Sequence, residues 1–218
     1  MIRESTDLAG VWRVPGLSAY EPVWTAMREF TEDRQEDTLD EVWLVEHLPV
    51  YTLGQAGKVQ HVLDTGDTPL VKTDRGGQVT YHGPGQIVAY VLADLRRTGL
   101  TIKSMVQALE QALIDTLDTC GVHNACRKDG APGVYVPTAH GSLAKIAALG
   151  IKVRKGCTYH GVALNVDMDL KPFGGINPCG YEGLETVTMA SEGVKSSWQA
   201  VAPTLAGKII EHGKLVVK

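Results

Sequence analysis

The chain has 218 residues, of which 44% are hydrophobic and 21% are charged, and its formal net charge is −4. These values are typical of a soluble globular protein and exclude a strongly basic nucleic-acid surface or a polybasic membrane anchor. The sequence has neither a run of about 20 apolar residues nor a cationic start followed by an apolar stretch. We therefore expect a cytoplasmic protein with free thiols, no membrane span and no nucleic-acid partner.

The first half of the chain predicts one amphipathic helix followed by several strands. Ser18 stands where it can cap the helix, and Pro49 stops the first strand. Scattered Gly, Gln, Asp and Pro residues over 51–70 indicate a long excursion on the surface. The predicted elements are a helix over 18–34 and strands over 41–50, 71–73, 78–82 and 86–93.

The second half adds two helices and a hairpin. Lys155 and Gly156 form a two-residue connection between two long strands, as in a tight hairpin. A glycine- and proline-rich segment follows over 171–183. Strict β-α-β alternation is absent, so we predict an α/β fold of the α+β kind, a mixed sheet flanked by helices in one domain over 1–218. The predicted elements are helices over 104–120 and 200–212 and strands over 133–136, 143–154 and 157–166.

A glycine-rich segment over 75–86 is the first candidate for binding. Its four glycines let the backbone approach a ligand closely. Arg75 offers a planar set of hydrogen-bond donors, and His82 titrates near neutral pH. A hairpin loop whose glycines only form turns is the alternative. The segment matches neither G-x-G-x-x-G after a strand nor a P-loop, so nucleotide phosphate binding is not indicated.

Cys179 is the candidate nucleophile. It lies between Pro178 and Gly180, in a turn that exposes the sulfur and brings backbone N–H groups near it, which favours a reactive thiol. A structural role is the alternative, and Cys126, beside Arg127 and Lys128, is the rival nucleophile on electrostatic grounds. Cys120 and Cys157 fit packing positions. The four cysteines form no C-x-x-C pair and match no common zinc motif, so no metal is expected.

Lys145 is the candidate base, because its neighbours are small and apolar. Partial desolvation would lower the pKa of this lysine and suit it to proton transfer. A lysine that extends from a strand edge into solvent is the alternative. No local element brings Lys145 and Cys179 together, so only the fold can pair them. The tetrapeptide Thr-Tyr-His-Gly occurs at 80–83 and at 158–161, either by chance or because two His-Gly loops surround one pocket.

Four segments resemble, in order, the motifs of the octanoyl-(acyl carrier protein)–protein N-octanoyltransferases, also called lipoyl(octanoyl) transferases. The resemblance implies the fold of the biotin and lipoate protein ligase catalytic domain. It also implies an acyltransferase that carries octanoate as a thioester on Cys179, uses Lys145 as base and needs no cofactor. The segments are RGGQVTYHGPGQ at 75–86, KIAALG at 145–150, TYHGVALNV at 158–166 and NPCG at 177–180.

The same resemblance implies a donor, an acceptor and a set of substrate-binding residues. Octanoyl-acyl carrier protein is the expected donor, and lipoyl domains of 2-oxoacid dehydrogenase and glycine cleavage proteins are the expected acceptors. We expect a monomer. Gly76 and Gly77 are expected to form the floor of an acyl tunnel. The substrate-binding residues are Arg75, Gly76, Gly77, Gln78, Val79, Thr80, Tyr81, His82, Ala148, Leu149, Gly150, Gly161, Val162 and Ala163.

Three other functions stay open at this point. An ATP-dependent lipoate–protein ligase of the same fold would activate a free acid and need no nucleophilic cysteine. An octanoyl amidotransferase would use a cysteine but take its acyl group from another lipoyl domain. A non-catalytic acyl-binding module would form no covalent adduct at all.

Overall fold

The structure is a computed structural model and describes residues 2–217. Its centre is a mixed seven-stranded sheet in the order β1-β2-β3-β7-β10-β9-β8, in which only β2 and β3 run parallel. This architecture confirms the predicted mixed sheet flanked by helices. The strands of this sheet are β1 (Glu4–Ser5), β2 (Val11–Ser18), β3 (Glu41–His47), β7 (Gln86–Leu92), β8 (Val134–Pro137), β9 (Leu143–Arg154) and β10 (Cys157–Asn165).

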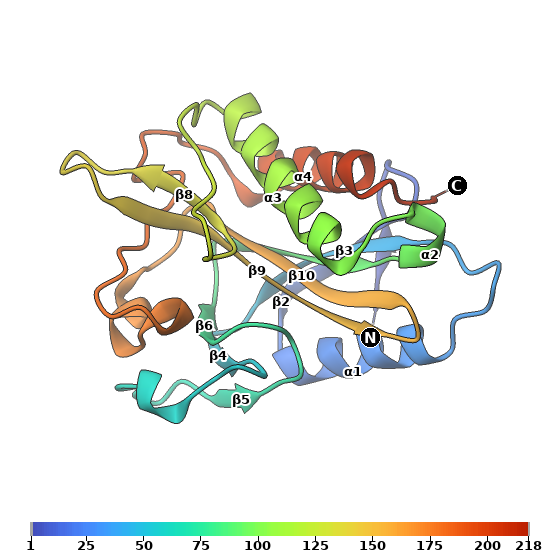
Figure 1. Cartoon of the computed structure of the whole chain (residues 1–218), viewed down its shortest axis with the longest axis horizontal. Helices are drawn as coiled ribbons and strands as arrows, with labels where there is room; N and C mark the ends of the chain where they lie inside the picture. Colours follow the sequence, from blue (N-terminus) through green and yellow to red (C-terminus); the bar gives the residue numbers. More distant parts are fainter. Residues whose placement is uncertain (1, 218) are drawn as a thin grey trace.

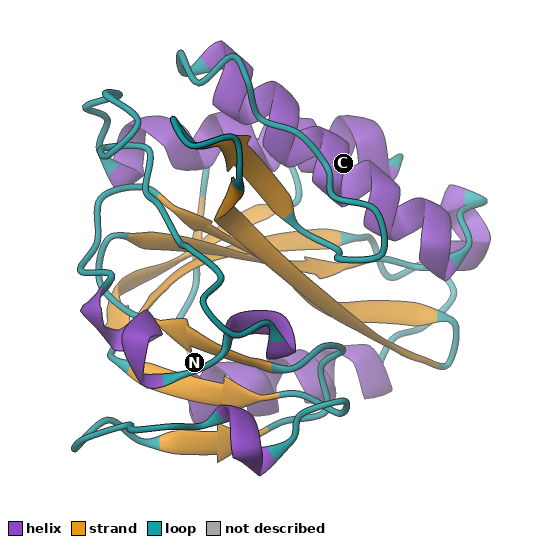
Figure 2. Ribbon diagram, turned by 60° about the vertical axis from the view of Figure 1, so that its left-hand side comes forward, coloured by secondary structure: helices purple, strands orange, loops and turns teal. Residues whose placement is uncertain are grey.

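Helices cover both faces of the sheet (Figures 1 and 2). Helix α1 (Tyr20–Glu32) lies on one face, whereas α3 (Ile102–Thr119) and α4 (Trp198–Gly213) lie side by side on the other; α2 (Leu95–Thr98) is a short turn between β7 and α3. The larger apolar core packs between the sheet and the α3–α4 pair, and a second core packs under α1. None of the helices in the described part of the chain is long and apolar enough to cross a membrane.

A second, three-stranded sheet lies beside the main one. Its order is β5-β4-β6, formed by β4 (Val50–Leu53), β5 (Leu70–Lys72) and β6 (Val79–His82). The prediction of a surface excursion over 51–70 was therefore wrong at both ends, because β4 and β5 pair with each other in parallel. Only the middle of that segment, with the 3₁₀ helix η1 (Val59–His61), is irregular. This small sheet carries the glycine-rich segment to one side of the main sheet.

One other local prediction was wrong, and one strand was missed. Ser18 ends strand β2 and does not cap α1, whose N-cap is Ala19 without a side-chain hydrogen bond. Strand β2 was not predicted, because Pro15 and Gly16 interrupt its apolar pattern and it pairs with β3 across a register shift. The hairpin prediction was right: Lys155 and Gly156 both have positive φ, as a two-residue turn between twisted strands requires.

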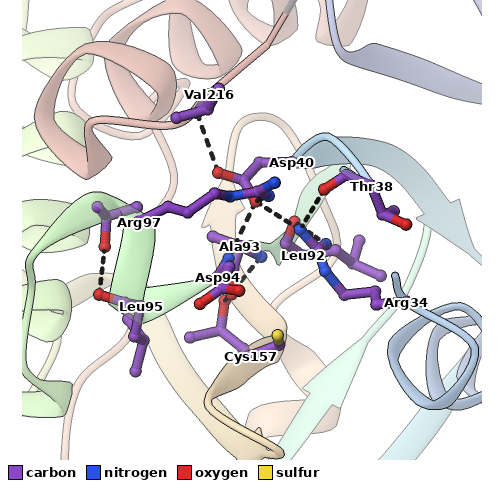
Figure 3. A network of polar contacts seen from close by, with 12 residues as sticks. Arg34, Thr38, Asp40, Leu92, Ala93, Asp94, Leu95, Arg97, Cys157 and Val216 are labelled. Carbon is purple, nitrogen blue, oxygen red and sulfur yellow. Dashed lines mark hydrogen bonds and ion pairs between the residues drawn. The ribbon is translucent and has the colours of Figure 1, made fainter. Parts of the chain in front are cut away.

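A buried carboxylate joins four distant segments (Figure 3). Asp40, just before β3, is fully buried and forms ion pairs of 2.6 Å with both Arg34 and Arg97. It also accepts hydrogen bonds of 2.9 Å from the backbone N–H groups of Asp94 and Val216. These contacts tie the end of α1, the start of α2 and the C-terminal segment to the start of the interior strand β3.

Candidate functional site

A largely apolar cavity of about 500 Å³, its open mouth included, lies between α1, the small sheet and the β9–β10 hairpin. Its floor is the face of strands β7, β9 and β10, and its wall is the glycine-rich segment. Its lining residues are Tyr20, Arg75, Gly77, Gln78, Val79, Thr80, His82, Val88, Tyr90, Ala148, Leu149, Gly150, His160, Gly161, Val162 and Ala163.

Twelve of the fourteen predicted substrate-binding residues line this cavity, and Gly76 and Tyr81 do not. Gly76 donates its N–H to the Ile151 carbonyl and lines a neighbouring groove, which Gly77 shares. The Tyr81 ring packs on the other side of β6 against Tyr51 and Phe173. Gly77 therefore lies in the wall of the cavity, and the sheet face forms the floor that was predicted from the two glycines.

Arg75 directs its donors to its own loop and to strand β4. Its Nη2 donates to the carbonyls of Thr52 and Gln78 at 2.6 and 2.7 Å, and its Nε donates to the Thr52 hydroxyl at 3.0 Å. The residue is 8% exposed. These bonds fix the glycine-rich loop against β4, so the side chain shapes the cavity wall.

Two histidines lie buried under the cavity in the neutral form. Burial lowers the pKa of His47 to about 4 and that of His82 to about 3. The imidazole of His82 contacts the Gln86 side chain at 2.7 Å and the Thr52 hydroxyl at 3.3 Å. A group with so low a pKa does not carry protons near neutral pH. His82 is thus a neutral ring in the cavity lining, held by Gln86 and Thr52.

We expect the free energy of unfolding to fall as the pH is lowered from about 7 to about 5. In the unfolded chain both histidines take up protons near pH 6.5, whereas in the folded chain they do so only near 4 and 3. The unfolded state binds more protons across this window, so acid favours it, by roughly 2 kcal/mol per histidine at pH 5. Urea unfolding at several pH values measures the loss. In His82→Gln the free energy of unfolding should depend less steeply on pH. An unchanged midpoint from pH 7 to 5 would contradict the prediction.

One carboxylate connects α1, the glycine-rich loop and β10. Asp74 accepts hydrogen bonds from the Trp24 indole at 2.9 Å, from the Tyr159 hydroxyl at 2.5 Å and from His160 Nε2 at 2.8 Å. Burial raises the pKa of Asp74, but these bonds outweigh burial and hold the pKa well below its usual range. Neighbouring residues of a regular strand point to opposite faces. Tyr159 and His160 reach the same carboxylate because His160 has φ of +62°.

Lys145 lies buried in β9, with 3% of its surface exposed. Its Nζ donates to the Pro132 carbonyl at 3.1 Å and lies 4.9 Å from the centre of the Tyr135 ring. A register shift in the β8–β9 pairing, between Val134 and Tyr135, brings the lysine to this position. Such bulges re-aim side chains next to active sites. The lysine does not extend from the strand edge into solvent, so the desolvated alternative of the sequence analysis is the observed one.

The loop in front of Lys145 is held in place from α3. Buried Glu110 accepts hydrogen bonds from the Gly133 N–H at 3.0 Å and from Arg127 at 3.2 Å. Gly133 has φ of +139°, and a Cβ at this position would lie 2.9 Å from the Lys145 Nζ. Only glycine both adopts this positive φ and leaves room for the Lys145 ammonium. Glu110 and Gly133 were not predicted from the sequence, because neither lies near a motif.

The segment with the predicted nucleophile faces Lys145. The side chain of Cys179 lies outside the described residues, but its backbone belongs to the 3₁₀ helix η3 (Pro178–Gly180). Pro178 and Lys145 line one small cavity, which shares Thr80 and Ala148 with the large one. A Cβ at Gly180 would lie 3.6 Å from the Gln78 side chain. The fold thus brings the NPCG and KIAALG segments together beside the apolar cavity.

Both flanks of this segment are paired through the backbone. Asn177 donates its N–H to the His61 carbonyl at 2.8 Å. On the other side, the Lys145 N–H donates to the Glu185 carbonyl at 2.8 Å, and the Lys145 carbonyl accepts from the Val187 N–H at 3.0 Å. The 3₁₀ helix η2 (Lys171–Gly175) precedes the segment.

Several residues around these cavities were missed by sequence reasoning. Tyr20, Val88, Tyr90 and His160 line the large cavity, and Asn165 and Thr186 line the small one. The repeated Thr-Tyr-His-Gly was a usable signal, because both of its histidines line the large cavity. Both lie in strands, β6 and β10, and not in loops as the sequence suggested.

The other chemical candidates lie apart from these cavities. Cys126, the rival nucleophile, pairs through its backbone with Tyr135 and lines neither cavity. Cys120 and Cys157 are free thiols, and burial raises the pKa of each. Among the described side chains, which do not include that of Cys179, no three from His, Cys, Asp or Glu are grouped so that they could hold a metal ion.

The chain is similar in sequence to known octanoyltransferases. It is 64% identical over 192 residues to the octanoyltransferase of Bordetella petrii, covering 88% of this chain and 90% of that protein. It is 58% identical over 203 residues to the octanoyltransferase of Burkholderia multivorans, covering 92% of this chain and 80% of that one.

The fold is also similar to that of lipoate protein ligases. The bipartite lipoate protein ligase of Thermoplasma acidophilum matches with a TM-score of 0.71 at 17% identity, covering 94% of this chain and 83% of that chain. A lipoate-protein ligase A bound with ATP matches with a TM-score of 0.66 at 17% identity, covering 89% and 83%. Residues 19–209 match the family model of the lipoyl protein ligase A/B catalytic domain. With this match and the sequence identities above, the chain belongs to the lipoyl protein ligase A/B catalytic domain family, among its octanoyltransferases.

Proposed function

We propose that this protein is an octanoyltransferase that moves an octanoyl group from an acyl-carrier thioester to a lysine of a lipoyl domain, through a thioester on Cys179. One observation carries the proposal: buried Lys145 shares a small cavity with Pro178, next to Cys179, and this cavity adjoins the large apolar one. The acceptors are lipoyl domains of 2-oxoacid dehydrogenase and glycine cleavage proteins, and the reaction belongs to the cytoplasm.

The first half-reaction forms the acyl-enzyme. A neutral Lys145 amine accepts the thiol proton of Cys179, and the thiolate attacks the donor's thioester carbonyl. The carrier thiol then leaves and takes a proton from the Lys145 ammonium. One thioester replaces another, so the exchange needs no ATP. Burial of the octanoyl chain in the cavity contributes roughly 0.8 kcal/mol per methylene.

The second half-reaction consumes the thioester. Lys145 accepts a proton from the acceptor's ε-amine, which attacks the carbonyl and forms an amide. The Cys179 thiolate leaves and recovers a proton from Lys145. Backbone N–H groups of the turn around Cys179 are the candidate donors to the oxyanion of each tetrahedral intermediate.

Intact-mass spectrometry after mixing the protein with octanoyl-acyl carrier protein, without ATP, tests the proposal. We expect one octanoyl group per chain, located on the Cys179 peptide and transferred when a lipoyl domain is added. Cys179→Ala should form no adduct, whereas the matched variant Cys126→Ser should form it normally.

The outcomes also separate the alternative functions. A protein that transfers octanoate only when free acid and ATP are supplied would be a ligase. A protein that accepts octanoate only from an octanoylated lipoyl domain would be an amidotransferase. Binding without any adduct would leave a non-catalytic acyl-binding module.

A further inference from the structure

One peptide group lies between a buried glutamate and Lys145. The carbonyl of Pro132 accepts a hydrogen bond from the Lys145 Nζ at 3.1 Å, and the N–H of Gly133 donates to Glu110 Oε1 at 3.0 Å. This carbonyl and this N–H belong to the same peptide bond. None of the described peptide bonds is cis, and in a trans peptide the C=O and the N–H point in opposite directions. Glu110 and Lys145 therefore bind opposite sides of one planar group.

The glutamate itself is held firmly on α3. Glu110 is 6% exposed, and its second carboxylate oxygen accepts a hydrogen bond from Arg127 Nε at 3.2 Å. Arg127 Nη2 donates in turn to the Gln107 carbonyl at 3.1 Å and to the Gln111 side chain at 2.8 Å. Each carboxylate oxygen thus has a partner. The carboxylate is a fixed acceptor for the Gly133 N–H on an 18-residue helix.

Without this acceptor the peptide is free to turn over. Gly133 has φ of +139°, and glycine adopts positive and negative φ about equally well. Rotation about the bonds on either side of the peptide carries the Pro132 carbonyl away from Lys145, and no side chain at residue 133 opposes it. The hydrogen bond from Gly133 to Glu110 therefore decides which way this carbonyl faces.

We propose that Glu110 is a positioning residue for the acyl transfer, because it fixes the peptide whose carbonyl holds the Lys145 amine. The proposal rests on the function proposed above, in which Lys145 is the base. A neutral amine has two N–H donors and one lone pair. A hydrogen bond to the Pro132 carbonyl uses a donor and leaves the lone pair to take the proton of the Cys179 thiol. Misplacement of a reacting group by about 1 Å can slow a reaction about 10²-fold.

Substitutions at Glu110 separate the position of its oxygen from its charge. The readout is the single-turnover rate constant for octanoyl-thioester formation on Cys179. Glu110→Gln keeps the length and an acceptor for the Gly133 N–H, so the rate should stay within about threefold of the wild type. Glu110→Asp keeps the charge but is one methylene shorter, and Glu110→Ala has no acceptor. Both should be about 10- to 100-fold slower. A fast Asp variant with a slow Gln variant would overturn the inference.

A double-mutant cycle with Lys145→Met separates positioning of the base from a general loss of structure. If Glu110 acts through Lys145, Glu110→Ala should slow the Lys145→Met variant by less than about twofold, because the two effects are not additive. Equal slowing in both backgrounds would show that Glu110 only supports the fold, and would overturn the inference. Glu110→Asp provides the same cycle if Glu110→Ala folds poorly.

Arg127→Met is the matched control. It removes the other partner of the Glu110 carboxylate and leaves the bond from Gly133 in place. This variant should unfold at a lower urea concentration, while its single-turnover rate constant stays within about threefold of the wild type. A rate as low as that of Glu110→Ala would show that loss of stability alone slows the reaction, and would contradict the inference.

The Lys145→Met variant by itself distinguishes the two proposals. A wild-type rate in Lys145→Met would remove the base from the proposed function, and the inference would fall with it. A slow Lys145→Met variant together with a wild-type rate in Glu110→Ala would overturn the inference alone.

Discussion

Lys145→Met should slow octanoyl transfer by roughly 10²- to 10⁴-fold near neutral pH, the usual contribution of a positioned acid–base group. Methionine keeps most of the length of the lysine side chain but cannot accept a proton. An unassisted thiol titrates near pH 8.5, so the variant's acylation rate should rise about tenfold per pH unit up to that value. Single-turnover formation of the octanoyl thioester on Cys179, measured from pH 6 to 9, checks both expectations.

Lys152→Met is the control for Lys145→Met. Lys152 lies on the same strand, β9, and its ammonium donates to the exposed Gln55 side chain at 3.0 Å. This substitution should leave the rate within about twofold, because surface changes of this kind have small effects. Normal turnover in Lys145→Met, or a rate without the predicted dependence on pH, would show that Lys145 does not move the proton.

Asp40→Ala should lower the free energy of unfolding by roughly 3–5 kcal/mol, because it leaves one buried and one partly buried cation without their shared partner. Arg34 is 5% exposed at its side chain and Arg97 24%, and both point at the same carboxylate oxygen. The substitution also removes the acceptor of the Val216 N–H, so the C-terminal segment should become more open to hydrogen exchange. Urea unfolding and amide exchange measure the two effects.

Glu32→Ala provides a comparison with a surface ion pair. Glu32 pairs with Arg154 and Lys155, but its side chain is 40% exposed and theirs are more exposed still. Exposed ion pairs of this kind contribute little to the free energy of unfolding. The decrease in Glu32→Ala should therefore be well under half of the decrease in Asp40→Ala. Equal losses in the two variants would contradict the argument from burial.

Local patterns predicted much of the fold. The β9–β10 hairpin, helix α3 and the strand after the glycine-rich segment follow from spacing and turn residues that act over a few positions. The same reasoning missed β2 and misjudged β4 and β5, because those strands depend on partners far along the chain. Ser18 has the right chemistry for a cap but is used in a strand.

In the candidate site too, local motifs were predicted and residues that act over long distances in the sequence were missed. The glycine-rich segment and residues 148–150 and 161–163 were predicted because each belongs to a contiguous motif. Tyr20 and Glu110 were missed because each acts across a helix–sheet contact that no local pattern records. Asp40 and Asp74 bind partners from several elements, and neither stands out from the other acidic residues in the sequence.

The backbone pairing of Lys145 with residues 185–187 separates two roles that one residue fulfils. Its peptide N–H and C=O pair with Glu185 and Val187 in the chain that follows the cysteine turn, whereas its ammonium lies over the Tyr135 ring and donates to the Pro132 carbonyl. The backbone pairing does not depend on which side chain stands at this position. A substitution of Lys145 removes the proposed base but keeps these backbone hydrogen bonds. A lower rate of octanoyl transfer in such a variant therefore reports on proton transfer and not on a displaced nucleophile.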